Sequence, residues 1–174
     1  PCLSQRSRSP CMNRVLAGEE DMAITPRPRS TPSALAFKSL TRSPLVFIAP
    51  VALADWTPAT PASPSVEQWR GVPMILAEAG LSREYADTWF RALGVTPTIY
   101  AQVAGHEAIV SMVSLGFGIG VVPRIVLDTS PLLERVRVLT VKPELPHYDI
   151  GLCVLNRRRK LPLIQALWDE VKER

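Results

Sequence analysis

The stretch that decides the fold is Val103–Pro123, VAGHEAIVSMVSLGFGIGVVP. It predicts the end of a strand, a glycine turn, an apolar helix, a glycine-rich turn and a second strand that ends at a proline. Because the helix is apolar on almost all sides, we expect it to be buried. Its first turn carries Gly105, His106 and Glu107 beside backbone N–H groups that the helix leaves unpaired. Such a helix start can hold the anionic group of a small ligand, so the stretch indicates a sensor pocket more than a catalytic centre.

Strand and helix patterns alternate along the rest of the chain. An amphipathic helix is expected after Ser82, which suits its N-cap, because apolar residues recur at Ala86, Trp89, Phe90 and Leu93. This alternation predicts an α/β fold with a largely parallel sheet. The expected strands, the first of them short and buried, are residues 22–24, 34–37, 44–49, 72–77, 98–103, 135–138 and 148–155.

Glycine and proline mark the ends of these elements. Gly18 suits the end of a helix that carries Met12 on its apolar face. Pro73, near the start of its strand, indicates an edge position in the sheet. Pro162 fits the first position of a final helix, which we expect to belong to the core together with its Trp168. Prolines 58, 61 and 64 indicate a linker or an exposed loop, and residues 66–69 a short helical turn.

The composition indicates a globular protein. The chain has 174 residues, of which 47% are hydrophobic, enough for one good core or two small lobes. No apolar run approaches the roughly 18 residues that span a bilayer, so no membrane partner is expected. The three cysteines form no CxxC pair, and no apolar leader is present, which favours a reducing cytoplasm. Residues 1–11, PCLSQRSRSPC, fit neither helix nor strand and are expected to be a disordered or foreign tail.

The formal charge of +4 invites a nucleic-acid hypothesis, but the basic residues gather in separate places. They lie near the start, in a proline-rich loop and at Arg157–Lys160. Neither an aromatic-interleaved basic groove nor a zinc-finger spacing accompanies them. We therefore interpret the charge as solvated surface rather than a nucleic-acid footprint.

Three segments resemble the effector-binding region of LysR-type transcriptional regulators: Leu16–Ile24, Trp89–Pro97 and Leu115–Pro123. The resemblance implies two α/β lobes of the type II periplasmic-binding-protein kind, with mixed, mainly parallel sheets. It assigns residues 12–48 and 142–174 to the first lobe and residues 49–141 to the second. It also implies that the chain is N-terminally truncated, without the first strand of that lobe and without a DNA-binding domain.

Four further segments resemble the family's regulators of branched-chain amino acid biosynthesis: Gly105–Ala108, Val110–Val113, Ile48–Pro50 and Leu163–Trp168. This resemblance implies a small carboxylate effector such as acetolactate or acetohydroxybutyrate, bound between the lobes. It also implies a homodimer or homotetramer of the full-length regulator, and operator contact only through the missing N-terminal winged helix-turn-helix. A branched hydroxy-keto acid needs a carboxylate anchor, partners for its hydroxyl and carbonyl, and an apolar slot.

The turn at Gly105 supplies the first candidate effector contacts, through its backbone N–H groups. His106 either donates to a carboxylate or keto oxygen or is a capping or core histidine. Glu107 either faces the ligand or complements the helix dipole. Gln102, at the end of the preceding strand, offers an amide to the same cleft.

Four more candidates come from family position. Ser82 and Arg83 open the second-lobe helix, as ligand contacts or as an N-cap and a solvated arginine. Thr25 and Arg27 follow the first-lobe strand on the cleft side. Arg27 suits a carboxylate, although its proline neighbours also fit a solvated side chain.

Two other classes of protein are alternatives to the hypothesis of an effector-binding domain. An enzyme is not expected, because two histidines leave little material for a triad or a metal site, and no cofactor or metal is implied. A solute-binding protein of similar fold for a small organic anion is the alternative, although it would call for a signal peptide. Dimerisation through lobe edges is compatible with the hypothesis of an effector-binding domain.

Overall fold

A computed structural model describes residues 10–52 and 69–171. The chain divides into two compact units: unit 1, which comprises Pro1–Ser43 and His147–Arg174, and unit 2, Pro44–Pro146. The lobe boundaries expected at residues 48 and 142 stay a prediction. The expected proline-rich linker and residues 66–68 of the short helical turn lie outside the described residues.

Helix α1 opens unit 1 and covers its sheet. It spans Pro10–Ala17 and ends at Gly18, whose φ of 78° is the left-handed conformation that glycine favours. Met12 is fully buried in a small core that α1 shares with the strands. The expected irregular tail is therefore wrong for Pro10 and Cys11, since proline is well suited to the first turn of a helix; residues 1–9 lie outside the described part. The core comprises Met12, Val15, Leu35, Cys153 and Leu155.

The sheet of unit 1 pairs β1 (Met22–Pro26) antiparallel with β7 (His147–Leu155). Ala23 packs toward the small core, whereas the side chain of Ile24 is 66% exposed. Side chains of a strand alternate between its two faces, so the expectation of a strand buried throughout is wrong at Ile24.

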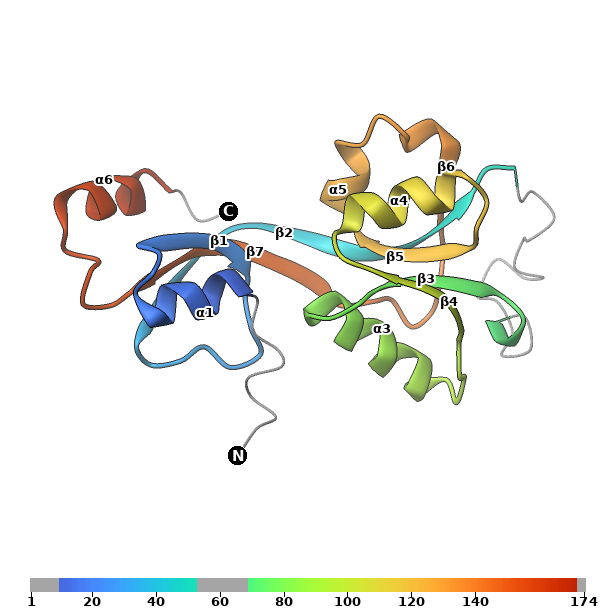
Figure 1. Cartoon of the computed structure of the whole chain (residues 1–174), viewed down its shortest axis with the longest axis horizontal. Coiled ribbons are helices and arrows are strands. Elements are labelled where there is room, and N and C mark those ends of the chain that lie inside the picture. Colours follow the sequence, from blue (N-terminus) through green and yellow to red (C-terminus); the bar gives the residue numbers. More distant parts are fainter. Residues whose placement is uncertain (1–9, 53–68, 172–174) are drawn as a thin grey trace. The chain divides into compact units, whose positions relative to one another are not determined.

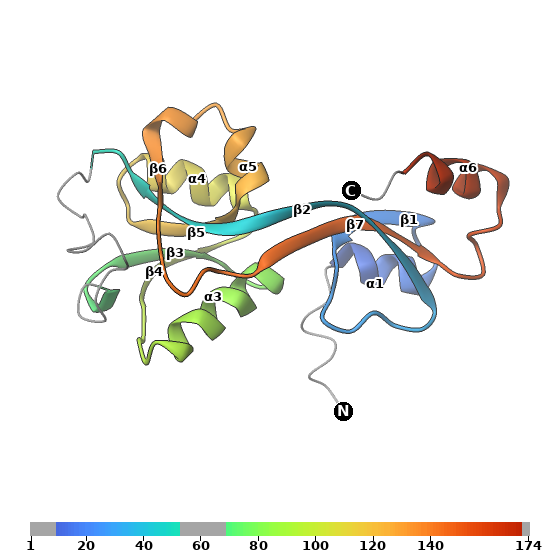
Figure 2. The same ribbon diagram turned by 180° about the vertical axis from the view of Figure 1, so that it is seen from behind.

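Strand β2 (Leu35–Pro50) replaces two expected strands. The prediction of two separate strands at residues 34–37 and 44–49 is wrong, because the polar residues between them are also extended. The strand has β7 and β5 as hydrogen-bonded neighbours, so backbone pairing does not depend on an apolar sequence. Figure 2 shows β2 as one continuous ribbon.

Unit 2 is built on a mixed sheet, in which β3 pairs parallel with β4 and with β5. Strand β2 pairs antiparallel with β5 and with β6, so antiparallel pairing has a larger share than the alternation indicated. The edge position expected for Pro73 is wrong, because β3 lies between β5 and β4. Pro73 is the first residue of its strand, where a missing N–H is tolerated. The bounds are β3 (Pro73–Ala77), β4 (Thr98–Val103), β5 (Ile119–Pro123) and β6 (Val136–Leu139).

Helices cover both faces of this sheet. Helix α3 (Leu81–Ala92) lies on one face, and α4 (His106–Ser114) and α5 (Arg124–Asp128) lie on the other (Figure 1). The expectation that α4 is buried on almost all sides is wrong: Ile109, Val110 and Val113 are buried and pack with strand residues in the larger core, whereas Glu107 and Ser111 are exposed. That core comprises Ile48, Ile75, Ile109, Val110, Val113, Val122, Leu127 and Val136.

An aromatic cluster fills the α3 side of the sheet. Phe47 points to this side, while its neighbour Ile48 belongs to the core beneath α4. The ring centroids of Phe47 and Trp89 are 4.7 Å apart, and those of Trp89 and Phe90 5.2 Å apart. Trp69 completes the cluster, at 4.8 Å from Phe47. The amphipathic repeat predicted for this helix is thereby confirmed.

Two elements near the end of the chain differ from expectation. The strand predicted from residue 135 begins at Val136, because Leu133–Arg135 form a 3-10 turn, η1. Helix α6 (Pro162–Glu170) begins at its proline as expected, yet Ile164 is its only buried residue. The core position expected for this helix is therefore wrong: Leu163 is 88% exposed, and Trp168 is half-buried.

Over the residues described, no helix combines the length and the apolar character that crossing a bilayer requires.

Candidate functional site

Parallel pairing brings two helix starts to one edge of the unit 2 sheet. Strand β3 leads into α3 and strand β4 leads into α4, so the carboxyl ends of both strands lie at this edge. Gly80 and Gly105 precede the two helices with φ values of 89° and 86°, a conformation that glycine adopts without strain. The first backbone N–H groups of both helices lack partners within their helices. Ligands of open α/β sheets bind outside the carboxyl ends of the strands.

A buried hydroxyl and an imidazole join the two helix starts. Ser82 Oγ lies 3.0 Å from His106 Nε2, and Ser82 is only 3% exposed. The N-cap role expected for Ser82 is wrong, because Gly80 takes the N-cap position and Leu81 is the first helical residue. The hydroxyl of Ser82 instead contacts the first residue of the neighbouring helix.

The surroundings of His106 favour the neutral imidazole. Burial lowers the pKa of His106 below its ordinary value of 6.5, and the carboxylate of Glu107 opposes this shift in part. A neutral imidazole has one nitrogen that donates and one that accepts a hydrogen bond, and the hydroxyl of Ser82 can serve either. The pair can therefore adapt to a hydroxyl or a carbonyl oxygen of a ligand.

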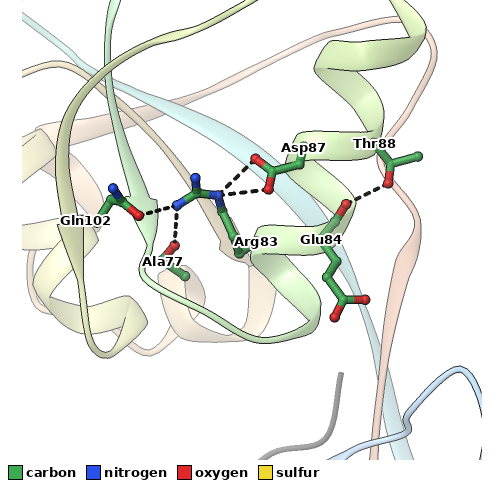
Figure 3. A network of polar contacts seen from close by, with 6 residues as sticks. All are labelled: Ala77, Arg83, Glu84, Asp87, Thr88 and Gln102. Carbon is green, nitrogen blue, oxygen red and sulfur yellow. Dashed lines mark hydrogen bonds and ion pairs between the residues drawn. The ribbon is translucent and has the colours of Figure 1, made fainter. Parts of the chain in front are cut away.

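Arg83 lies next to Ser82 and is held by its own unit (Figure 3). Its Nη1 donates to the carbonyl oxygen of Ala77 at 3.1 Å and to Oε1 of Gln102 at 2.7 Å. Its Nε donates to both carboxylate oxygens of Asp87, at 2.9 and 3.0 Å. The solvated arginine expected as one alternative is therefore wrong, because the charge of Arg83 is matched inside the protein and its side chain is only 18% exposed. Its contact with an effector stays a prediction.

The other candidates of this turn are closer to solvent. Gln102 and Glu107 are exposed, and Gly105 supplies the turn into α4. The structure thus brings together six of the eight predicted residues: Ser82, Arg83, Gln102, Gly105, His106 and Glu107.

Thr25 and Arg27 belong to unit 1. Thr25 is buried, with 2% of its surface exposed. The Nε atom of Arg27 lies 2.8 Å from Oδ2 of Asp149, and its guanidinium lies 4.4 Å from the ring centroid of Phe37. The carboxylate that Arg27 contacts is therefore supplied by β7. A contact between Arg27 and an effector stays a prediction.

Sequence reasoning missed the two acidic partners of these arginines. Asp87 stands four residues after Arg83 on the same helix, a spacing that commonly gives an ion pair, and so could have been found. Asp149 lies inside a largely apolar strand, where a carboxylate signals a specific partner; Ser39 Oγ also donates to it at 2.5 Å. Among the residues described, no group of three or more histidine, cysteine or acidic side chains could hold a metal ion.

Comparison with known proteins decides the family. The family model of the LysR substrate binding domain matches residues 3–174. The chain belongs to this family. The HTH-type transcriptional regulator IlvY of Escherichia coli K12 is 38% identical over 160 residues, which are 90% of this chain and 53% of that protein. The HTH-type transcriptional activator IlvY of Haemophilus influenzae is 32% identical over 155 residues, 88% of this chain and 52% of that protein. The chain thus spans about half the length of these relatives.

Solved regulatory and effector binding domains share the fold. The Synechocystis PCC6803 CcmR regulatory domain, in complex with 2-PG, aligns with a TM-score of 0.75 at 18% identity, over 91% of this chain and 75% of that chain. The effector binding domain of QuiR, in complex with shikimate, aligns with a TM-score of 0.70 at 22% identity, over 90% and 72%. The expected type II periplasmic-binding-protein-like α/β fold is confirmed for this LysR substrate binding domain.

Proposed function

We propose that this chain is the effector-sensing domain of a LysR-type transcriptional regulator, and that its effector is a small hydroxy-keto carboxylate such as 2-acetolactate or acetohydroxybutyrate. The observation that carries the proposal is the edge of the unit 2 sheet, where two helix starts meet and the buried Ser82 contacts the half-buried His106. The similarity to the IlvY regulators supports the regulatory role. The resemblance of Gly105–Ala108 to regulators of branched-chain amino acid biosynthesis supports the choice of effector.

The chemistry of this edge suits such an anion. The effector's carboxylate accepts hydrogen bonds from backbone N–H groups at the start of α4, where the helix dipole favours negative charge. Its hydroxyl or keto oxygen hydrogen-bonds to the Ser82–His106 pair, which holds both a donor and an acceptor. Binding requires no catalytic group, and we propose that the domain performs no reaction.

At the level of the regulator, the proposal extends to its partners. The regulator assembles as a homodimer or homotetramer in the cytoplasm, and its helix-turn-helix contacts operator DNA. The effector binds one of two states of the regulator more tightly and so shifts the population toward that state. This shift changes the action of the regulator on DNA.

Thermal unfolding of the 174-residue chain tests the proposal directly. A ligand that binds only the folded state raises the midpoint, and at 100 times Kd it adds about 2.7 kcal/mol to the stability. We expect a saturable rise with 2-acetolactate, and none with valine or pyruvate at the same concentrations. A cooperative transition that acetolactate leaves unmoved, or an equal rise with valine, would contradict the proposed effector.

A further inference from the structure

We propose that Arg83 is a positioning residue of the effector site: its side chain ties the start of α3 to the carboxyl ends of β3 and β4, and so holds Ser82 against His106. The inference rests on the proposed function only for the identity of the ligand, since the contacts belong to the ligand-free protein. It assigns Arg83 to the support of the site rather than to direct contact with the effector.

The contacts of Arg83 join three elements. Ala77 is the last residue of β3, Gln102 is the next-to-last residue of β4, and Asp87 lies one turn further along α3. The guanidinium hydrogen-bonds to all three, at 2.7–3.1 Å (Figure 3). Its planar fork allows one side chain to serve several acceptors in a fixed geometry, which a lysine ammonium does not reproduce.

The same two parts of the chain are joined a second time by the Ser82–His106 contact. Ser82 is the neighbour of Arg83 in the first turn of α3, and His106 follows β4 by a short glycine turn. A hydrogen bond weakens steeply as its angle and distance depart from ideal values. A shift of the α3 start relative to β4 would therefore loosen the 3.0 Å contact between Ser82 and His106.

A direct contact between Arg83 and the effector's carboxylate is the competing role. The Arg83 side chain is only 18% exposed, and its Nε already faces a carboxylate at 2.9 Å. Swinging toward a ligand would break that ion pair and the hydrogen bonds to Ala77 and Gln102. The arrangement therefore favours anion recognition by backbone N–H groups, with Arg83 fixed behind them.

The side-chain NMR signals of His106 report on this positioning without any ligand. We would record the imidazole nitrogen shifts of the ¹⁵N-labelled chain against pH for wild type, Arg83→Gln and Arg83→Lys. In both variants we expect the His106 midpoint to move up toward its ordinary value of 6.5, because a displaced imidazole loses part of the burial that lowers its pKa. We also expect acetolactate affinity to fall roughly 3- to 10-fold, as for the loss of one ordinary hydrogen bond.

Arg124→Gln is the matched control. Arg124 forms the same kind of ion pair as Arg83, with Asp128 four residues later, at 2.6 Å on α5 of the same unit. We expect this variant to keep the wild-type His106 titration and the wild-type affinity.

Two results would overturn the positioning role. One is a His106 titration unchanged in both Arg83 variants; the other is wild-type affinity in Arg83→Lys together with a loss in Arg83→Gln, as a direct charge contact requires. If neither variant folds, Asp87→Asn takes their place, and an unchanged His106 titration again overturns the role. If the titrations shift as expected but wild type binds no acetolactate, the effector assignment fails and the positioning role stands.

Discussion

Burial of a histidine at the site couples stability to pH. Burial lowers the pKa of His106 below 6.5, so the unfolded chain takes up a proton before the folded protein does. Stability that depends on the neutral imidazole is therefore complete above pH 6.5, falls as the pH drops below that value, and stops falling once the folded histidine is itself protonated.

His106→Asn tests this at the scale of one residue. Asparagine keeps a polar group next to Ser82 but does not titrate, so we expect the free energy of unfolding to depend less on pH between 7.5 and 5.5 than in wild type. Urea denaturation at several pH values measures it. His147→Asn is the control, since His147 is exposed and is the only other histidine in the sequence. Equal pH dependence in His106→Asn and wild type would contradict the claim that burial of His106 couples stability to pH.

The chemical character of single residues was easier to predict than their partners. The ability of His106 to form polar contacts at a helix start follows from its neighbours in the sequence. Its contact with Ser82, 24 residues away, does not, because it depends on the parallel pairing of β3 and β4. The cap role of Ser82 failed because α3 begins before Ser82, at Leu81, with Gly80 as its N-cap.

At the scale of elements, the packing of α4 against β5 depends on Gly120. A Cβ atom placed there would lie 2.4 Å from Cγ2 of Ile109 and 3.0 Å from Cγ2 of Val113. The helix therefore approaches the strand more closely than any residue larger than glycine permits.

Gly120→Ala should lower the free energy of unfolding by about 1–3 kcal/mol, the usual cost of overpacking a core. Urea denaturation measures the change. Gly71→Ala is the control, because a Cβ at Gly71 would meet nothing within 4 Å, and we expect it to change stability by less than about 0.5 kcal/mol. Equal stabilities of the two variants would contradict the packing described for α4.

Elements with a strong local pattern were predicted well, and those defined by neighbours were not. The amphipathic repeat of α3 and the apolar run of β5 each carry their own signal. The polar middle of β2 carries none, because its extended form depends on the strands beside it. Pro73 likewise carries no information on which strand lies beside it, so its edge position was predicted wrongly.

At the scale of the whole molecule, the alternation of strand and helix patterns predicted the fold class, and the segments Leu16–Ile24, Trp89–Pro97 and Leu115–Pro123 indicated the family, which comparison confirms. The sites of unit 1 were harder to predict. The sequence offered a ligand or solvent as the partner of Arg27 and gave no sign of its contact with Asp149, more than a hundred residues further along the chain. Such a partner becomes visible only when β7 returns to pair with β1.

We propose above that a small carboxylate binds where α3 and α4 begin. The most direct measurement is an NMR titration of the ¹⁵N-labelled chain with 2-acetolactate, followed at the backbone amides. We expect saturable shifts concentrated at Leu81–Arg83 and His106–Ala108, with the amide of Gln165 in α6 unmoved. Saturable shifts confined to other elements, or no shift at these two helix starts, would contradict this proposal.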